Sequence, residues 1–219
     1  MFNRYTFIKN KEFTDDDPQW KPIYNAAPTF KLPVIHLEGE YTNFYWGLML
    51  KWANNKVISS KLYNITVKDL MEKPRLKKAF ESQRCIVPAD GFYIWRKVGK
   101  KTQIPYYCYG IGNFGIAALW ESSEDIDNNT LNCFQTLVHH AEINNFKCEA
   151  PCVLRTDQFQ QWLDIDADTQ KLLAGIRENN DLKFSIHTVN PAISNININS
   201  PSLIKPCTPA DQYGNYTLF

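Results

Sequence analysis

Short apolar segments rich in β-branched and aromatic residues recur along the chain and are separated by turn residues, a pattern that predicts strands joined by hairpins. The expected strands are Leu32–Leu37, Thr42–Leu48, Cys85–Pro88, Phe92–Lys97, Ile104–Tyr109, Gly115–Trp120, Leu131–Val138 and Phe184–Val189. Turns are expected at Asp90-Gly91, at Gly99 and at Asn128-Asn129, because these residue types favour tight turns. The pattern therefore predicts a large, mostly antiparallel sheet system.

Helical spacing of apolar residues appears in three segments. The first is expected to start at Pro74, the second at a Thr156 cap, and the third near Asp168 with Asn179-Asn180 as its stop. Their inward faces would carry Leu76, Ala79 and Phe80, then Phe159, Trp162 and Leu163, then Leu172, Leu173 and Ile176. The polar stretch from Asn190 to Phe219 is expected to be loop, packed through Ile204 and Pro206. With no linker or repeat in view, the sequence predicts one α+β domain over residues 1–219.

The size and composition of the chain narrow its class. A chain of 219 residues can bury an ample core without disulfides or metal. Its six cysteines therefore fit reduced thiols better than a disulfide framework. No apolar run is long enough to cross a membrane, and the N-terminus lacks the pattern of a signal peptide. We expect a cytoplasmic protein that does not bind membranes, most simply a monomer.

Charge is distributed unevenly along the chain, although the net charge is only +1. Between Lys51 and Lys101 there are 13 basic and 4 acidic residues. One interpretation is a solvated helix face bearing Lys73, Arg75, Lys77 and Lys78, together with a hairpin tip bearing Lys97, Lys100 and Lys101. The other is a single basic groove for a nucleic-acid backbone.

Common cofactor and metal motifs are weak or missing. The chain has no P-loop, no GxGxxG and no G-x-S-x-G elbow, so we expect no cofactor. Cys148, Cys152, His139, His140 and Glu149 are metal-ligand types, but Cys-x-x-x-Cys without a second pair is a poor zinc signature. Adjacent histidines in a strand also point to opposite faces. Buried thiols beside a hydrogen-bonded histidine are the more economical interpretation, and no metal is expected.

Aromatic residues accompany the basic stretch. Trp46, Trp52, Phe92, Tyr93 and Trp95 lie in it or just before it. Most aromatic residues in a chain of this size belong to the core. Rings inside a positive groove, however, are what a single-stranded nucleic-acid binder needs, because bases stack on them.

Several segments resemble the SOS response-associated peptidase (SRAP) family, in the family's order. They are Asn25-Ala26-Ala27-Pro28-Thr29 with Leu32-Pro33-Val34-Ile35, Tyr45-Trp46-Gly47-Leu48, Glu72-Lys73-Pro74 to Ala79-Phe80, Arg84-Cys85-Ile86-Val87-Pro88-Ala89-Asp90-Gly91-Phe92-Tyr93-Ile94-Trp95, Ala117-Ala118-Leu119-Trp120, Pro151-Cys152-Val153-Leu154 and Val189-Asn190 to Pro206. The resemblance implies one barrel-like, mostly antiparallel domain with a few flanking helices. It also implies recognition of abasic sites in single-stranded DNA, with a covalent link through an N-terminal cysteine.

In that chemistry the α-amine attacks the sugar aldehyde, the thiol closes a thiazolidine, a carboxylate and a histidine move protons, and an asparagine orients the sugar. Phe2 stands at the position of the cysteine, Ile94 at that of the glutamate and Lys147 at that of the histidine, whereas Asn64 keeps the asparagine. Glu149 replaces a DNA-facing arginine and Thr66 another arginine. DNA contacts are implied for Arg4, Pro28, Trp46, Gly47, Phe92 and Trp95.

Three functions remain open from the sequence. The first is a SRAP-like pseudoenzyme that binds single-stranded or abasic-site DNA without cross-linking it. The second is an active abasic-site processor or peptidase-like enzyme that uses Lys147 or the Met1 amine in a rearranged site. The third is a non-enzymatic module for a protein or ligand. Fold alone does not decide among them, because function resides in the site.

Overall fold

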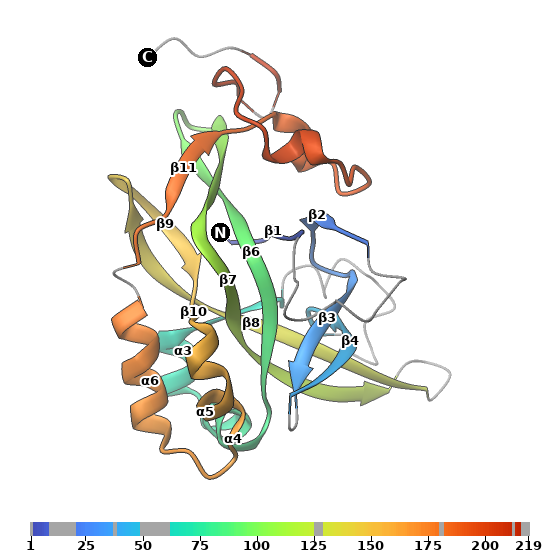
Figure 1. Cartoon of the computed structure of the whole chain (residues 1–219), viewed down its shortest axis with the longest axis vertical. Helices are drawn as coiled ribbons and strands as arrows, with labels where there is room; N and C mark the ends of the chain where they lie inside the picture. Colours follow the sequence, from blue (N-terminus) through green and yellow to red (C-terminus); the bar gives the residue numbers. More distant parts are fainter. Residues whose placement is uncertain are drawn as a thin grey trace.

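The fold is organised around a sheet that closes on itself (Figure 1). The computed structural model describes residues 2–8, 21–36, 39–48, 62–124, 129–179, 182–211 and 213–215. Its strands are β1 (Tyr5–Phe7), β2 (Ile23–Ala26), β3 (Lys31–His36), β4 (Glu40–Trp46), β5 (Asn64–Thr66), β6 (Arg84–Lys97), β7 (Gln103–Glu124), β8 (Thr130–Ile143), β9 (Phe146–Pro151), β10 (Val153–Leu154) and β11 (Ser185–Thr188). Five of them, in the order β7-β8-β4-β3-β6, form a barrel because β6 pairs back onto β7. Most pairings are antiparallel, although β4 and β5 run parallel to β8. The predicted fold class is confirmed.

Long strands replace several of the short ones expected. β6 unites two predicted strands and runs straight through Asp90-Gly91, so the turn predicted there is wrong. The pairing with β7 shifts register between Ala89 and Gly91 instead. A Cβ on Gly91 would lie 2.3 Å from the hydroxyl of Tyr107. Glycine is therefore required at this position for the close approach of two strands.

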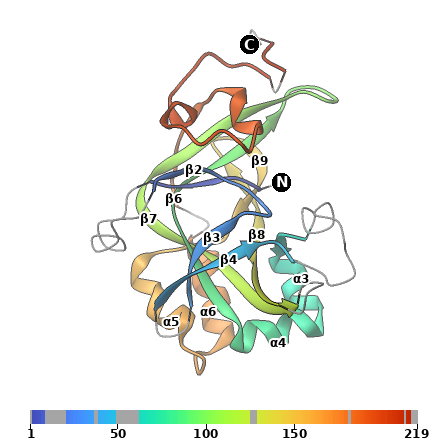
Figure 2. The same cartoon turned by 90° about the vertical axis from the view of Figure 1, so that its right-hand side faces the viewer.

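Among the described residues, four α-helices gather at one end of the barrel (Figure 2). They are α3 (Val67–Glu72), α4 (Pro74–Ser82), α5 (Phe159–Leu163) and α6 (Thr169–Glu178), with 3₁₀ turns at Thr156–Gln158, Pro191–Ser194 and Pro201–Ile204. The predictions for α4 and α6 are confirmed, and Asp168 caps α6 by accepting a bond from the Gln170 N–H at 2.8 Å. Thr156 lies inside a 3₁₀ turn that Arg155 precedes, so the predicted cap there is wrong.

The C-terminal segment crosses the opposite end of the molecule (Figure 1). Its 3₁₀ turns bury Ile193 and Leu203. Asn25, itself buried, donates from Nδ2 to the carbonyl oxygens of Ile193, Asn195 and Ile198 at 3.4, 3.0 and 3.0 Å. The asparagine of the Asn25-Ala26-Ala27-Pro28-Thr29 segment therefore has a structural role, because it clamps this segment onto β2.

Replacing Asn25 with alanine is expected to cost about 1 to 3 kcal/mol, because buried carbonyl groups lose their donor. Hydrogen exchange should show protection lost over residues 193–198, and denaturant unfolding should report the same loss of stability. The exposed Asn197, which lies in the same segment, gives the matched control Asn197→Ala. Unchanged protection in Asn25→Ala would show that the clamp does not hold the segment.

All six cysteines are free thiols in this structure. Four of them, Cys85, Cys108, Cys133 and Cys152, are buried. Burial raises the pKa of the Cys85 thiol well above its ordinary value.

Over the described ranges, no helix is long and apolar enough to cross a membrane.

Candidate functional site

A cleft of about 940 Å³ opens beside the second half of β6. One wall is β6 from Ile94 to Lys97, and the other is the hairpin of β8 and β9. Asn144 and Asn145, both with positive φ, form the tight turn of that hairpin. The lining residues are Ile94, Trp95, Arg96, Lys97, His140, Ala141, Glu142, Asn145, Phe146, Lys147, Cys148 and Glu149. Arg96 and Lys97 lie on the β6 wall, whereas Lys147 shares the other wall with Glu142 and Glu149. The guanidinium of Arg96 stacks 4.6 Å from the ring of Phe146.

The backbone of residue 2 reaches Glu149 in this cleft. The Phe2 N–H donates to Oε1 of Glu149 at 3.0 Å, and Asn64 Nδ2 donates to the Phe2 carbonyl oxygen at 2.6 Å. Asn64 Nδ2 also lies 3.2 Å from Glu149 Oε1, and Thr136 Oγ1 donates to Asn64 Oδ1 at 2.6 Å. Two side chains from different strands therefore hold residue 2 in place.

Further polar groups surround this arrangement. Burial raises the pKa of Tyr63, the nearby charge of Glu149 raises it further, and Arg4 and a hydrogen bond from Asn3 oppose the rise. Arg4 is itself buried, which lowers its pKa to about 10, while the charge of Tyr63 raises it. Arg4 therefore stays protonated at neutral pH. Its Nη1 donates to the Asn3 carbonyl oxygen at 2.7 Å.

The positions that match the family's chemistry come together in space. Ile94 and Lys147 both line the cleft, and Phe2 and Asn64 contact Glu149, which also lines it. Ile94 is 2% exposed and belongs to the core. Phe2 is completely buried, with ring centroids 5.6 Å from Trp46 and 6.2 Å from Phe92. The side chain at position 2 is thus a packing group in this chain.

Two predicted DNA contacts belong to the core. Trp46 is completely buried, stacks on Phe134 with centroids 6.1 Å apart, and donates from Nε1 to the Tyr63 carbonyl oxygen at 3.0 Å. Phe92 is also completely buried and contacts the ring of Phe184. Because neither ring has an exposed face, the expectation of a base stacked on Trp46 or Phe92 is wrong for this structure.

The other expected contacts are dispersed. Trp95 is half-buried, packs against the cluster that contains Val189, Ile193 and Leu203, and is among the residues that line the cleft. Gly47 is buried, with φ of +106°, and donates to the Phe134 carbonyl oxygen. Pro28 is half-buried in the turn before Thr29. Neither Gly47 nor Pro28 lines the cleft.

The basic stretch does not form one groove over its described part. Lys73, Arg75, Lys77 and Lys78 lie on or beside α4, whereas Lys97 to Lys101 lie at the β6–β7 hairpin, at the other end of the molecule (Figure 1). Lys73 pairs with Asp69 at 2.8 Å. Lys51 and Trp52 lie outside the described residues. The helix-face and hairpin-tip interpretation is the one that the described residues follow.

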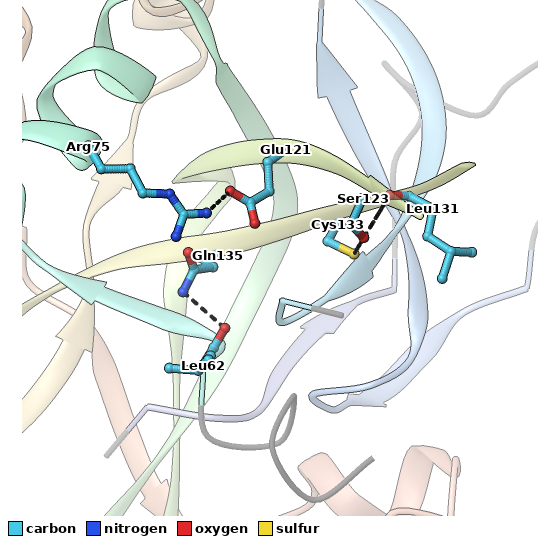
Figure 3. A network of polar contacts seen from close by, with 7 residues as sticks. All are labelled: Leu62, Arg75, Glu121, Ser123, Leu131, Cys133 and Gln135. Carbon is cyan, nitrogen blue, oxygen red and sulfur yellow. Dashed lines mark hydrogen bonds and ion pairs between the residues drawn. The ribbon is translucent and has the colours of Figure 1, made fainter. Parts of the chain in front are cut away.

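A second pocket, of about 440 Å³, lies between α4 and the strands β7 and β8. Figure 3 shows Arg75 paired with Glu121 at 2.5 Å, with Gln135 beside them donating to the Leu62 carbonyl oxygen at 3.0 Å. This pairing neutralises the arginine, which weakens the case for a phosphate contact there.

Glu149 is the residue whose role the sequence concealed. The sequence shows only that the negative Glu149 stands where the family motif has a positive arginine. The contact of Glu149 with residue 2 is visible only in the fold. The sequence offers one signal: Phe2, Ile94 and Glu149 all differ from the family motif. Ile94 stands where the motif has a glutamate on β6, and Glu149 places a carboxylate on β9.

Cys148 lies next to Glu149 in the cleft. Burial raises the pKa of the Cys148 thiol, so this thiol is protonated at neutral pH. Within the described ranges, no three His, Cys, Asp or Glu side chains form a group that could hold a metal ion.

Comparison with known proteins agrees with the resemblance of the motifs. The family model "SOS response associated peptidase (SRAP)" matches residues 3–196. The chain is 28% identical to the abasic site processing protein YoqW of Bacillus subtilis, over 85% of this chain and 87% of that protein. It is 26% identical to the abasic site processing protein HMCES of Rattus norvegicus, over 86% of this chain and 68% of that one.

A crystal structure of a protein from Bacteroides thetaiotaomicron has the same fold, with a TM-score of 0.67 and 21% identity over 84% of this chain and 85% of the other. A Bordetella bronchiseptica protein gives a TM-score of 0.66 at 17% identity, over 86% and 99%. The family match spans most of the chain and includes β6 and β9, the two strands that border the cleft. The chain belongs to the SOS response associated peptidase (SRAP) family.

Proposed function

We propose that this protein binds single-stranded DNA, including DNA with an abasic site, in the cleft between β6 and β9, and forms no thiazolidine cross-link with it. The absence of a thiazolidine cross-link is inferred from Phe2, because the position that would supply the thiol holds a completely buried phenyl ring. Binding is supported by the relatives named as abasic site processing proteins and by Arg96, Lys97 and Lys147 along the cleft.

The first measurement is denaturing electrophoresis of the wild-type protein with single-stranded DNA that contains an abasic site. We expect no heat-stable shifted band, because the thiazolidine needs an amine and a thiol on the same residue. Intact-mass measurement belongs to the same experiment, since the bulky Phe2 is expected to leave Met1 in place. A heat-stable band would contradict the proposal, and its linked residue would identify the amine responsible.

Fluorescence anisotropy with a labelled single strand tests binding itself. The affinity should fall steeply as salt rises, because phosphate contacts release counterions. Lys147→Ala removes a cation from the cleft and should reduce the salt slope by about one unit. Lys77→Ala, on the exposed face of α4, is the matched control and should change nothing. No binding at low salt would contradict the DNA proposal.

A ligand or protein module is the second candidate, and Glu149 is the observation that favours it. Its carboxylate would repel a phosphate at a position where the family motif has arginine. If anisotropy detects no DNA at low salt, this candidate replaces the first.

A further inference from the structure

The two walls of the cleft differ in charge. The β6 wall presents the cations Arg96 and Lys97, and the guanidinium of Arg96 lies 4.6 Å from the centroid of the Phe146 ring. The wall made by β8 and β9 carries the carboxylates of Glu142 and Glu149. Phosphates of a bound strand are attracted to the first wall and repelled by these carboxylates. The two sides of the cleft therefore suit different parts of a nucleotide.

Glu149 is a carboxylate whose position is fixed before any ligand binds. The residue is half-buried, and its Oε1 accepts from the Phe2 N–H at 3.0 Å and from Asn64 Nδ2 at 3.2 Å. Thr136 Oγ1 in turn donates to Asn64 Oδ1 at 2.6 Å. An ionised carboxylate has two oxygens with about four acceptor sites, so Glu149 Oε2 can accept a further donor from a ligand in the cleft.

The chemistry of DNA limits which donor that is. The cleft, of about 940 Å³, is at the upper end of the volumes that enclose a small molecule, so a nucleotide fits in it. Phosphates carry no donor at neutral pH, and the deoxyribose inside a strand has no free hydroxyl group. The donors of an intact nucleotide are therefore all on its base. The exocyclic amino group of cytosine is one that Glu and Asp accept from in protein–DNA recognition.

We propose that Glu149 is a base-recognising residue: its Oε2 accepts a hydrogen bond from the exocyclic amino group of a base, while Arg96 and Lys97 bind phosphates of the same strand. The inference rests on the proposed function, because it needs a single strand in this cleft. It gives the carboxylate a partner of matching chemistry, and it assigns Glu149 to sequence preference. Cytosine, which has the amino group, is preferred over a base of the same shape that lacks it.

Fluorescence anisotropy at neutral pH with two labelled probes tests this preference. One probe is a short single strand of deoxycytidine. The other is the same strand with pyrimidin-2-one in place of each cytosine, a base that lacks only the amino group. The wild-type protein should bind the cytosine strand about tenfold more tightly, the usual effect of one specific base contact.

Glu149→Gln should abolish or reverse this preference. The Phe2 N–H and the Asn64 amide both donate at the Oε1 position, so the carboxamide must place its oxygen there and its NH₂ group where Oε2 was. A donor then meets the cytosine amino group, whereas pyrimidin-2-one presents no amine at that place. A general defect in folding would weaken the binding of both strands alike and leave their ratio unchanged.

Glu142→Gln is the matched control, because it removes the same charge from the same wall. Glu142 is exposed and lies opposite Lys147 in the β8–β9 ladder, whereas Glu149 lies opposite His140. Side chains two apart on a strand share a face, so both carboxylates are on one side of the hairpin. Glu142→Gln should keep the tenfold preference for cytosine, and both variants should bind DNA more tightly overall through the loss of a negative charge.

Three results would overturn the role of Glu149. They are equal wild-type affinities for the two strands, a cytosine preference that persists in Glu149→Gln, and a preference lost to the same extent in Glu142→Gln. In each case binding that still weakens with salt leaves the proposed function standing. Failure of the wild-type protein to bind either strand at low salt would contradict the proposed function itself.

Discussion

Replacing Phe2 with alanine is expected to destabilise the protein by about 3 to 5 kcal/mol, the usual cost of deleting a buried phenyl ring. Phe2 is completely buried and contacts the rings of Trp46 and Phe92. The deletion would leave a cavity among large, interlocked side chains that cannot collapse to fill it. In a chain of this size the midpoint of thermal unfolding should fall by roughly 6 to 20 °C.

Denaturant unfolding followed by tryptophan fluorescence measures this effect, because Trp46 lies against the deleted ring. Phe2→Leu keeps most of the volume and should lose much less. Ile165→Ala, at a residue 64% exposed, should stay within about 0.5 kcal/mol of wild type. If Phe2→Ala unfolds like the Ile165 control, the ring has no packing role and position 2 is open for chemistry.

Replacing Arg84 with methionine is expected to cost about 3 to 5 kcal/mol, as large as the Phe2 effect but of electrostatic origin. Arg84 is 5% exposed. Its guanidinium donates to the carbonyl oxygens of four residues, Phe80, Glu81, Trp162 and Asp164. They lie at the C-terminal ends of α4 and α5, where the helix dipoles are negative. One buried cation thus donates hydrogen bonds to carbonyl groups at two helix ends. Methionine would leave these carbonyl groups without donors.

Equilibrium unfolding of Arg84→Met should be compared with Arg75→Met, which breaks only the exposed pair with Glu121 and should lose at most about 1 kcal/mol. Arg84→Lys keeps the charge but not the fork of donors, and it should fall between the two. A loss in Arg84→Met no larger than in Arg75→Met would show that water can replace the guanidinium at both helix ends.

Much of the fold follows from the local pattern, since strand alternation and the spacing of α4 and α6 are properties of neighbouring residues. The sequence pattern did not predict β1, β2, β5, β9, β10 or α3, which are short or polar. β1 and β5 pair with strands distant in the chain, whereas β9 forms a hairpin with the neighbouring β8. Gly91 also shows that a contact with a distant residue is not visible in the local sequence. Its neighbour Asp90 made a turn the natural expectation, whereas the ring of Tyr107, which belongs to another strand, is what requires glycine.

Candidate site residues could be named where the segments match the family motifs. Where the segments differ from the motifs, the sequence did not indicate what the new residues do. The roles that motif order assigns to the positions of Phe2, Ile94 and Lys147 stay predictions, although Ile94 and Lys147 line one cleft and the Phe2 N–H contacts Glu149 of the same cleft. Burial, however, depends on packing, so the sequence could not distinguish a base-stacking Trp46 from a core Trp46. The contact of Glu149 with residue 2 joins positions 147 apart in the chain, which no local pattern encodes.

The clamp made by Asn25 bears on the order in which the chain acquires its structure during synthesis. Its partners lie 168 to 173 positions further along the chain, so a ribosome must pass Ile198 before β2 can be sealed in this way. Pairings of such long separation form slowly because the intervening loop must first be closed. A nascent chain stalled before Ile193 would hold β2 with its asparagine unsatisfied, and it should remain a substrate for chaperones until residues 193–198 emerge.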